Sequence, residues 1–220
     1  IPAPVAVAET FAEVLRDGTL WTHTRATLQA TLAGLGIGVA VGGVLGYLIA
    51  RIPLLEDLLS PVIVAFQATP VVAYAPLLVV WFGSGIESKV ITCALIVFFP
   101  MLMNTVVGIR HVPGDLRDLM RVSGASRWQT LTKLELPAAM PVLLTGLKTS
   151  ATLAVIGVVV GEFILAREGL GLLMNTARAR FDTPLVFVAV ITLALIASTL
   201  YFAVTLLERR LLAWQRRTTI

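Results

Sequence analysis

The sequence predicts an all-helical integral membrane protein, and three properties of its composition point that way. Of the 220 residues, 57% are hydrophobic and only 14% are charged, and the mean hydropathy is +0.91. Water-soluble chains are typically about 45–50% apolar and about 25% charged. The chain therefore has too few polar side chains to cover a water-soluble fold. This composition excludes a disordered tail, a nucleic-acid-binding domain and most cytosolic enzymes.

Five segments meet the length requirement for a membrane span. A helix needs about 20 mostly apolar residues to cross the hydrocarbon core, and backbone groups in lipid must be satisfied within their own segment, so helices are expected. The five segments cover approximately residues 26–50, 58–82, 90–107, 137–165 and 184–207. The second contains Pro61, Pro70 and Pro76, which are expected to bend it.

Glycines recur at every fourth residue of the first span, at Gly34, Gly38, Gly42 and Gly46. Small residues at this spacing form a groove in which a second helix can approach closely. These glycines do not fit the G-x-G-x-x-G pattern of a dinucleotide-binding turn, and no predicted strand precedes them. We therefore expect a helix-packing surface.

The basic residues divide unequally between the two sets of connecting loops. One set holds ten Lys and Arg against six acids, and the other holds six against six. The ten are Arg51, Arg110, Arg117, Arg121, Arg127, Lys133, Arg209, Arg210, Arg216 and Arg217. Cytoplasmic loops carry an excess of Lys and Arg, so this set is expected in the cytoplasm, with Lys89 and Arg178 outside. Five crossings then place the N-terminal residues outside, and a cytoplasmic start requires a sixth helix upstream.

The longest polar stretch, residues 111–137, lies between the third and fourth spans. Asp115 is expected to cap a short helix that presents Leu116, Leu119 and Met120 on one face. This stretch could form a compact cytoplasmic knob or a helical hairpin lying on the membrane surface.

Gly124 separates this first short helix from a second. Ser126 and Gln129 form an S-x-x-Q capping box that begins the second helix, and Pro137 lies where a further helix could begin. Glycine between two capped helices indicates a backbone with positive φ, or close approach to a partner.

The stretch resembles the signature loop of permease subunits of binding-protein-dependent ABC importers. That loop reads Glu-Ala-Ala, three residues, Gly, nine residues, then Ile-x-Leu-Pro. The matching positions here are Asp118, Leu119, Met120, Gly124, Leu134, Leu136 and Pro137. The acid of the motif is kept as Asp118, whereas its small alanines are replaced by larger residues.

Further short motifs along residues 2–215 resemble one branch of that family, the nitrate/sulfonate/taurine and vitamin-precursor permeases. They are Pro76–Gly83, Ser88–Lys89, Phe99–Pro100, Asn104–Thr105, Gly146–Lys148, Gly161–Phe163 and Gly169–Gly171. The resemblance implies a type I ABC importer transmembrane domain over residues 1–220, in a bacterial-type inner membrane, with residues 113–136 as its cytoplasmic coupling loop. The loop residues expected to serve the ATPase are Asp118, Leu119, Met120, Gly124, Ala125, Ser126, Leu134 and Pro137.

The resemblance also implies the partners: a second permease copy, a cytoplasmic ABC ATPase dimer and an external solute-binding protein. The sequence contains no G-x-x-x-x-G-K-[ST] loop, so ATP and Mg²⁺ are expected on the ATPase and this chain is not expected to be an enzyme. No metal site is expected, because His23, His111 and Cys93 have no ligand partners at suitable spacing.

Polar side chains within spans are costly and are therefore candidates for a translocation path. Lys148 and Glu162 lie on the fourth span, about 21 Å apart along one face. Lys148 could line a cavity or meet an anionic solute, or it could snorkel or join helices through an ion pair. Glu162 could form an external gate or fix the Gly169–Gly171 turn.

Three further path candidates lie on the second and third spans. Residues Gln67 to Tyr74 surround Pro70 in the second span, and this stretch could line the path or be a plain kink. Gln67 and Asn104 could face a cavity or join helices by hydrogen bonds.

The cargo suggested by the resemblance is a small vitamin or precursor of the riboflavin or thiamine-pyrimidine type, because Gly146–Phe163 resembles those permeases. A nitrate, sulfonate or taurine importer is the alternative. A stand-alone secondary transporter would be expected to show inverted repeats, and none is evident in the sequence. A structural membrane protein would not need the cytoplasmic knob.

Overall fold

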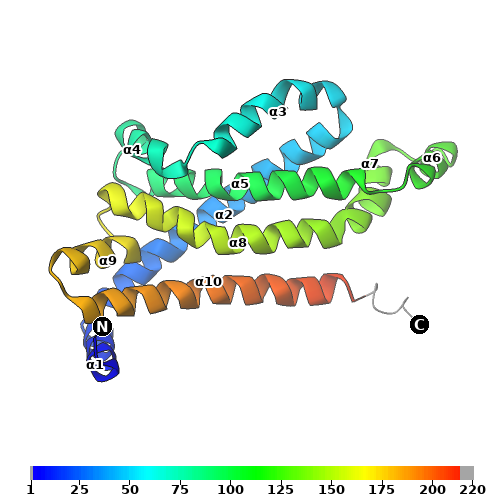
Figure 1. The fold of residues 1–220 in the computed structure, drawn as a ribbon. Helices are drawn as coiled ribbons and strands as arrows, with labels where there is room; N and C mark the ends of the chain where they lie inside the picture. The colour runs from blue at the N-terminus through cyan, green and yellow to red at the C-terminus, as the bar shows by residue number, and fades with distance from the viewer. Residues whose placement is uncertain (1, 214–220) are drawn as a thin grey trace.

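The computed structural model describes residues 2–213, which form long helices running between two ends of the molecule (Figure 1). In chain order the helices are α1 (Pro4–Arg16), α2 (Thr19–Arg51), α3 (Pro53–Ala68), α4 (Val71–Phe82), α5 (Ile86–Arg110), α6 (Gly114–Val122), α7 (Arg127–Thr130), α8 (Leu136–Leu165), α9 (Leu170–Ala179) and α10 (Thr183–Leu211). Helices α2, α5 and α8 pack together as the centre. α10 lies along α8, and α3 and α4 lie on the opposite side (Figure 1).

The five predicted spans are found, one of them in two pieces. α2, α5, α10 and the continuous helix Arg127–Ile164 are each long and apolar enough to cross a membrane, and α3 with α4 makes a fifth, bent span. α2 begins at Thr19, whereas the predicted span began near residue 26. The prediction missed the first turns of the helix because their residues are polar and do not meet a hydropathy criterion. α1 and α9 were not predicted, since both are too short to meet the span criterion. Arg216 and Arg217 lie outside the described residues.

The second span breaks at one proline rather than bending at three. α3 and α4 meet at 96°, and Thr69, directly before Pro70, is extended with φ −86° and ψ 121°. A residue before proline is pushed out of the helical region in this way. Pro61 and Pro76 lie inside α3 and α4. The expectation of a bend is therefore correct, and the helix is interrupted at Pro70.

The glycine stripe of α2 is a helix-packing surface, as predicted, and the helix packed on it is α5. Gly34, Gly38, Gly42 and Gly46 are all buried. A Cβ at Gly38 would lie 2.7 Å from the carbonyl oxygen of Ala94, and the other three would meet α5 atoms at 2.5–2.7 Å. The two backbones therefore approach too closely for any side chain at these positions.

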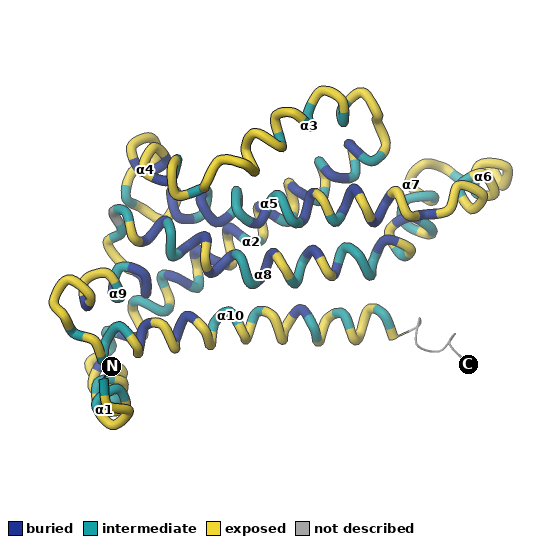
Figure 2. Tube along the Cα trace, viewed as in Figure 1, coloured by how far each residue is buried: buried dark blue, intermediate teal, exposed yellow. Residues whose placement is uncertain are grey.

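Burial is concentrated in the central helices, whereas α3 is exposed along its length (Figure 2). α3 has no buried residue, yet it carries apolar side chains such as Leu54, Leu58 and Val64 on its surface. α10 similarly exposes Phe202 and Leu206. Apolar exposed faces of this kind suit the lipid environment that the composition predicts.

A π-helical turn over Leu131–Glu135 joins α7 to α8 without a break. The N–H of Leu136 donates to the carbonyl of Leu131, five residues earlier. Pro137 follows directly, and a proline ring clashes with the carbonyl four residues before it, here that of Lys133. The wider turn accommodates that ring, so the second short helix runs on into the fourth span instead of ending before it.

Candidate functional site

The coupling loop, residues 113–136, projects beyond the ends of α2, α5 and α8 (Figure 1). Its second helix begins as predicted: the N–H of Gln129 donates to Oγ of Ser126 (3.2 Å), and the N–H of Ser126 donates to Oε1 of Gln129 (2.8 Å). Both halves of the capping box are therefore present.

The first helix of the loop begins differently from the prediction. α6 starts at Gly114, its N-cap residue is Pro113, and Asp115 lies within the first turn without making a side-chain cap. Pro113 holds an extended ψ of 135° that sets the entry to the helix. Asp115 still places a negative charge near the helix N-terminus, which favours it electrostatically.

Gly124 has a positive φ of 71°, as predicted. Its N–H donates to the carbonyl of Arg121 (3.1 Å), and the N–H of Ala125 donates to the carbonyl of Met120 (3.0 Å). These two bonds form a Schellman motif that ends α6. A Cβ on Gly124 would meet no atom within 4 Å. Within this chain, glycine is therefore required by the backbone conformation and not by crowding.

The tip of the coupling loop presents unpartnered apolar side chains. α6 has no buried residue, and Leu119, Val122 and Trp128 are exposed, Val122 by 87% and Trp128 by 70%. Asp118 is exposed too and pairs with Arg121 of its own helix (3.1 Å). Large apolar groups exposed together on a projecting segment are typical of a protein-binding surface.

The remaining loop residues assigned to coupling lie nearer the bundle. Met120, Ala125, Leu134 and Pro137 are half-buried, whereas Ser126 is exposed as the helix cap. Leu134 lies within the π turn, and Pro137 lies in the first turn of α8. They therefore connect the tip to α8 rather than form the tip.

An ionic cluster beneath the coupling loop was not foreseen from the sequence. Glu135 is fully buried and pairs with Arg117 (Nε–Oε1, 3.0 Å) and Arg51 (3.2 Å). The hydroxyl of Tyr47 donates to the same carboxylate at 3.3 Å. The cluster borders an open groove of about 890 Å³. Residues lining this groove include Arg51, Arg117, Arg121, Arg127 and Trp128.

Three of the predicted path residues lie on α3, α4 and α5. Gln67 is exposed near the end of α3, and Tyr74 is half-buried on α4. The Tyr74 hydroxyl is buried and has no hydrogen-bond partner among the described residues. Asn104 donates to the carbonyl of Pro100 on its own helix (2.8 Å) and packs against Gly146 of α8.

Lys148 forms an ion pair between two helices, one of the roles considered for it. Its Nζ contacts Oε2 of Glu208 on α10 and lies 6.0 Å from the centre of the Tyr201 ring. This pair ties α8 to α10 within the chain.

Glu162 holds the turn between α8 and α9, again one of the two roles considered. Oε1 accepts a hydrogen bond from the Thr27 hydroxyl (2.8 Å), and Oε2 accepts one from the N–H of Gly171 (2.7 Å). Thr27 also accepts a bond from the N–H of Leu170 at 2.8 Å. The buried carboxylate thus joins α2, α8 and the start of α9.

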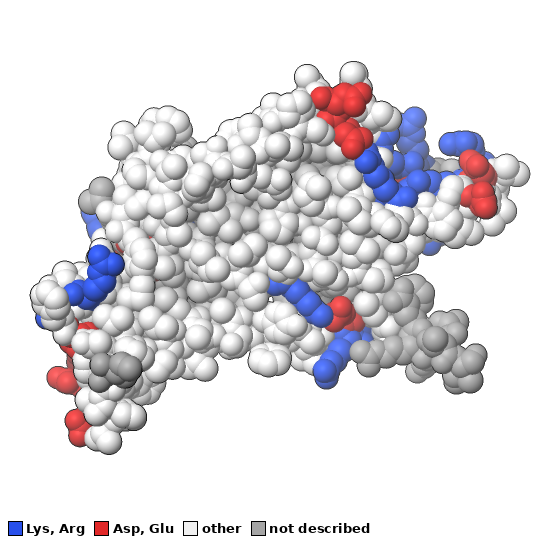
Figure 3. All heavy atoms as spheres, viewed as in Figure 1, with Lys and Arg blue, Asp and Glu red and all other residues white. Residues whose placement is uncertain are grey.

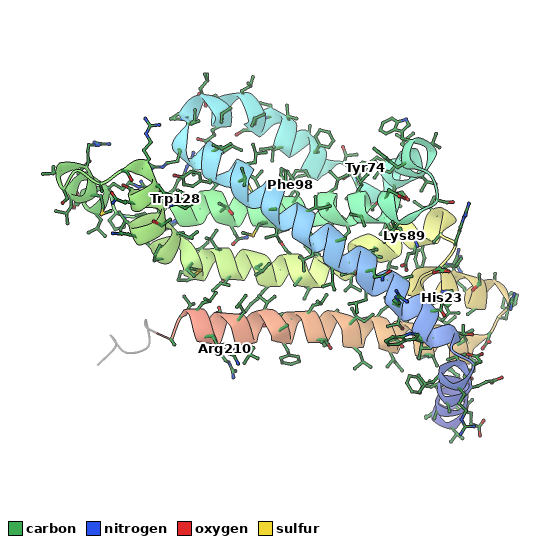
Figure 4. The ribbon with its side chains drawn as sticks, turned by 180° about the vertical axis from the view of Figure 1, so that it is seen from behind. His23, Tyr74, Lys89, Phe98, Trp128 and Arg210 are labelled. Atoms are coloured by element: carbon green, nitrogen blue, oxygen red, sulfur yellow. The ribbon has the colours of Figure 1, made fainter. Side chains whose placement is uncertain are left out.

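Two more side chains fasten the same turn. Nζ of Lys89 donates to the carbonyl of Glu168 (2.6 Å), and the N–H of Gly169 donates to Nδ1 of His23 (3.0 Å). Figure 4 shows His23 and Lys89 at the end of the molecule opposite Trp128. From the sequence, Lys89 is expected in a family motif and an external loop, and His23 is excluded as a metal ligand. Their role in this turn was not predicted, because their partners are backbone atoms.

Charged side chains gather at the two ends, with a broad uncharged band between them, interrupted by a small mixed group near α10 (Figure 3). Arg51, Arg110, Arg117, Arg121 and Arg127 lie at or near the coupling-loop end, in or beside α6 and α7. This separation is what a chain crossing a bilayer requires.

Residues 38–213 match the family described as the binding-protein-dependent transport system inner membrane component. The chain belongs to this family. It is the permease subunit of an ABC importer, a multi-pass inner-membrane protein, and ATP is hydrolysed on a separate subunit.

The permease is similar to proteins of the predicted branch. It is 52% identical over 215 residues to the riboflavin transport system permease protein RibX of Chloroflexus aurantiacus, covering 98% of this chain and 80% of RibX. It is 35% identical to the formylaminopyrimidine transport permease protein ThiX of Halalkalibacterium halodurans, covering 99% and 86%. It is 32% identical to the taurine transport system permease protein TauC of Escherichia coli, covering 97% and 80%.

Solved structures confirm the predicted fold. A chain of the inward-facing MetNI methionine ABC transporter superposes with a TM-score of 0.75 at 20% identity, covering 86% of this permease and 94% of that chain. A chain of an amino acid ABC transporter with histidines superposes with a TM-score of 0.68 at 17% identity, covering 96% and 100%. The permease thus has the fold of a type I ABC importer transmembrane domain.

Proposed function

We propose that this permease carries a riboflavin-type vitamin or vitamin precursor and couples its import to a cytoplasmic ATPase dimer. The observation that carries the cargo is the 52% identity to RibX over nearly the whole chain. The proposed assembly contains two permease copies and an external solute-binding protein. ATP and Mg²⁺ are held by the ATPase in this proposal.

The coupling role of residues 113–136 is supported by the shape and surface of the loop. Its tip projects from the end where basic residues gather, and it exposes Leu119, Val122 and Trp128. The Schellman turn at Gly124 fixes the angle between the two short helices. The apolar side chains of such a knob are more stable in a groove on a partner protein than in water.

The bend between α3 and α4 is our proposal for the path lining, with Gln67, Tyr74 and Asn104 as its polar side chains. Interrupted helices at membrane depth are tolerated where they line a cavity or are buried in protein. The unpartnered Tyr74 hydroxyl supports the proposal, because a buried hydroxyl without a partner is costly unless a ligand or water satisfies it. Lys148 and Glu162, both assigned to the path from sequence, already have partners within this chain.

The cargo is tested by transport in proteoliposomes that contain the permease, its ATPase and its binding protein. ATP-dependent uptake of labelled riboflavin is expected, and it should require the binding protein. Formylaminopyrimidine and taurine are measured in parallel. Uptake of taurine without riboflavin would replace the vitamin proposal with the sulfonate alternative.

Coupling through the loop is tested by Gly124→Val. Valine is β-branched and poorly suited to φ 71°, so the turn should be displaced. A cost of about 1–3 kcal/mol would weaken ATPase binding about 5- to 150-fold. Co-purification of the ATPase and ATP hydrolysis stimulated by loaded binding protein are measured at equal amounts of inserted permease.

Gly114→Val is the matched control, because Gly114 also has open space around its Cβ but lacks a positive φ. It should behave as the unmodified permease does. Gly124→Asn should retain most binding, since asparagine tolerates the left-handed region. Unchanged ATPase binding in Gly124→Val would show that coupling does not depend on this turn.

A further inference from the structure

Glu135 is the centre of a buried cluster that joins the coupling loop to two membrane helices. Its side chain is 0% exposed. One carboxylate oxygen accepts a bond from Nε of Arg117 on α6, and the other contacts Arg51 and Tyr47, both on α2. Glu135 itself lies in the π turn before α8.

Arg117 extends this cluster to a third membrane helix. Its guanidinium also donates to the carbonyl of Ile109, which lies in the last turn of α5. α6 otherwise packs only sparsely on the rest of the described chain and buries no residue of its own. Arg117 is therefore the main non-covalent connection between α6 and the bundle.

The charges of the cluster make it costly to separate the arginines from the Glu135 carboxylate. One buried carboxylate is shared by two guanidiniums, whose side chains remain 34% exposed for Arg51 and 26% for Arg117. A buried carboxylate is strongly destabilised if its partners move away, whereas a partly exposed arginine can regain water. A displacement of α6 would therefore pull on Glu135, and through it on α2.

We infer that Glu135 is a positioning residue that transmits movement of the coupling loop to α2 and α5, in addition to the covalent path through α8. The inference rests on the proposed coupling function. In this arrangement the ATPase moves the knob, and the cluster makes the inner ends of α2, α5 and α8 move with it as one body. Without the cluster, the knob could still dock, but part of its movement would not reach α2 and α5, because α6 makes few other contacts with the bundle.

Glu135→Gln tests this by removing the charge while keeping the size of the side chain. The variant should still co-purify the ATPase, because Glu135 is buried and does not form the exposed tip. The amount of solute carried per ATP hydrolysed should fall about 5-fold or more. Arg117→Gln should give the same phenotype, and the double variant should lose no more than either single one, because both act through one contact.

Glu56→Gln is the matched control. Glu56 of α3 also pairs with an arginine, Arg110 of α5, at the same end of the molecule, but both side chains are well exposed. Exposed ion pairs contribute little, so this variant should keep the normal ratio of solute to ATP. The ratio does not depend on how much folded protein is present, so a merely structural defect would leave it unchanged.

The possible failures are distinguishable. A normal ratio in both single variants would overturn the inference while leaving the proposed function intact. If the unmodified permease failed to bind an ATPase through the loop, the proposed function would fall, and the inference with it. If Glu135→Gln did not accumulate in the membrane, Arg117→Gln would decide the question, since in that variant the buried Glu135 carboxylate keeps its contacts with Arg51 and Tyr47.

Discussion

Phe181 has a backbone conformation that usually belongs to glycine. Its φ is 58°, and the N–H of the next residue, Asp182, donates to the carbonyl of Ala177 (2.9 Å) to close a Schellman turn after α9. Its ring is 91% exposed. The chain thus carries backbone strain in the connection between α9 and α10 without burying the aromatic side chain in return.

Phe181→Gly should therefore stabilise the permease. The left-handed region costs a non-glycine residue about 1–2 kcal/mol, offset in part by the greater freedom of glycine in the unfolded chain. Thermal unfolding in detergent should show a higher midpoint. Phe181→Ala removes the ring but keeps the strain, so it should gain little. Equal gains in both variants would mean that the ring, and not the backbone, is the source of the cost.

Single residues differ in how far their roles follow from sequence. The positive φ of Gly124 could be predicted because both neighbouring helices carry local signals: an apolar face at helical spacing before it and a capping box after it. Glu135 could not, since the partner hydroxyl of Tyr47 lies 88 positions away along the chain and no local pattern brings them together. For Glu162, the hold on the Gly169–Gly171 turn was one of the two predicted roles, but its bond with Thr27 was not predicted, because the two residues meet only after α2 and α8 have packed.

At the scale of helices, spacing is informative where one helix face decides the contact. The four-residue repeat of glycines was enough to predict a helix-packing face on α2, because the repeat and the helix period nearly coincide, but it did not indicate that α5 is the partner. The position of the bend in the second span was not predictable. Pro61, Pro70 and Pro76 look alike in sequence, and only Pro70 interrupts the helix.

Gly38→Ala should weaken the α2–α5 contact. The new methyl group would lie 2.7 Å from the carbonyl of Ala94 and 2.8 Å from Val97, so the helices must separate, at a cost of about 1–3 kcal/mol. Gly36→Ala on the same helix has nothing within 4 Å and should be neutral or slightly stabilising. The stabilities of the Gly38→Ala and Gly36→Ala variants are compared by unfolding in mixed detergent. A similar stability for both variants would show that the helices adjust without penalty.

At the scale of the whole molecule, composition and loop charge predicted a membrane protein with two chemically different ends, and the structure separates the charges in that way (Figure 3). The family is also evident from sequence, because its motifs are short and local. The position of α10 along α8 and the placement of α1 and α9 at one end are not, since they depend on contacts between distant segments (Figure 1).

The orientation of the whole molecule is tested with single cysteines and an impermeant thiol reagent in intact cells. Arg178→Cys should be labelled from outside and Arg127→Cys should not, because the latter lies at the basic end expected in the cytoplasm. The natural Cys93 is fully buried and should contribute no background. Opening the cells should make position 127 reactive. External labelling of position 127 in intact cells would reverse the orientation.

The π turn before Pro137 has a consequence for how the knob faces its partner. Each residue of an α-helix advances the side chains by about 100° around the axis, and the π turn over Leu131–Glu135 inserts roughly one residue into an otherwise continuous helix. The azimuth of Trp128 relative to α8 is therefore set by that one inserted residue. Deleting a residue from the turn would leave the helix axis nearly unchanged but rotate the knob by about 100°. Deletion of this single residue would therefore turn the exposed apolar side chains of the coupling loop away from a groove on the partner.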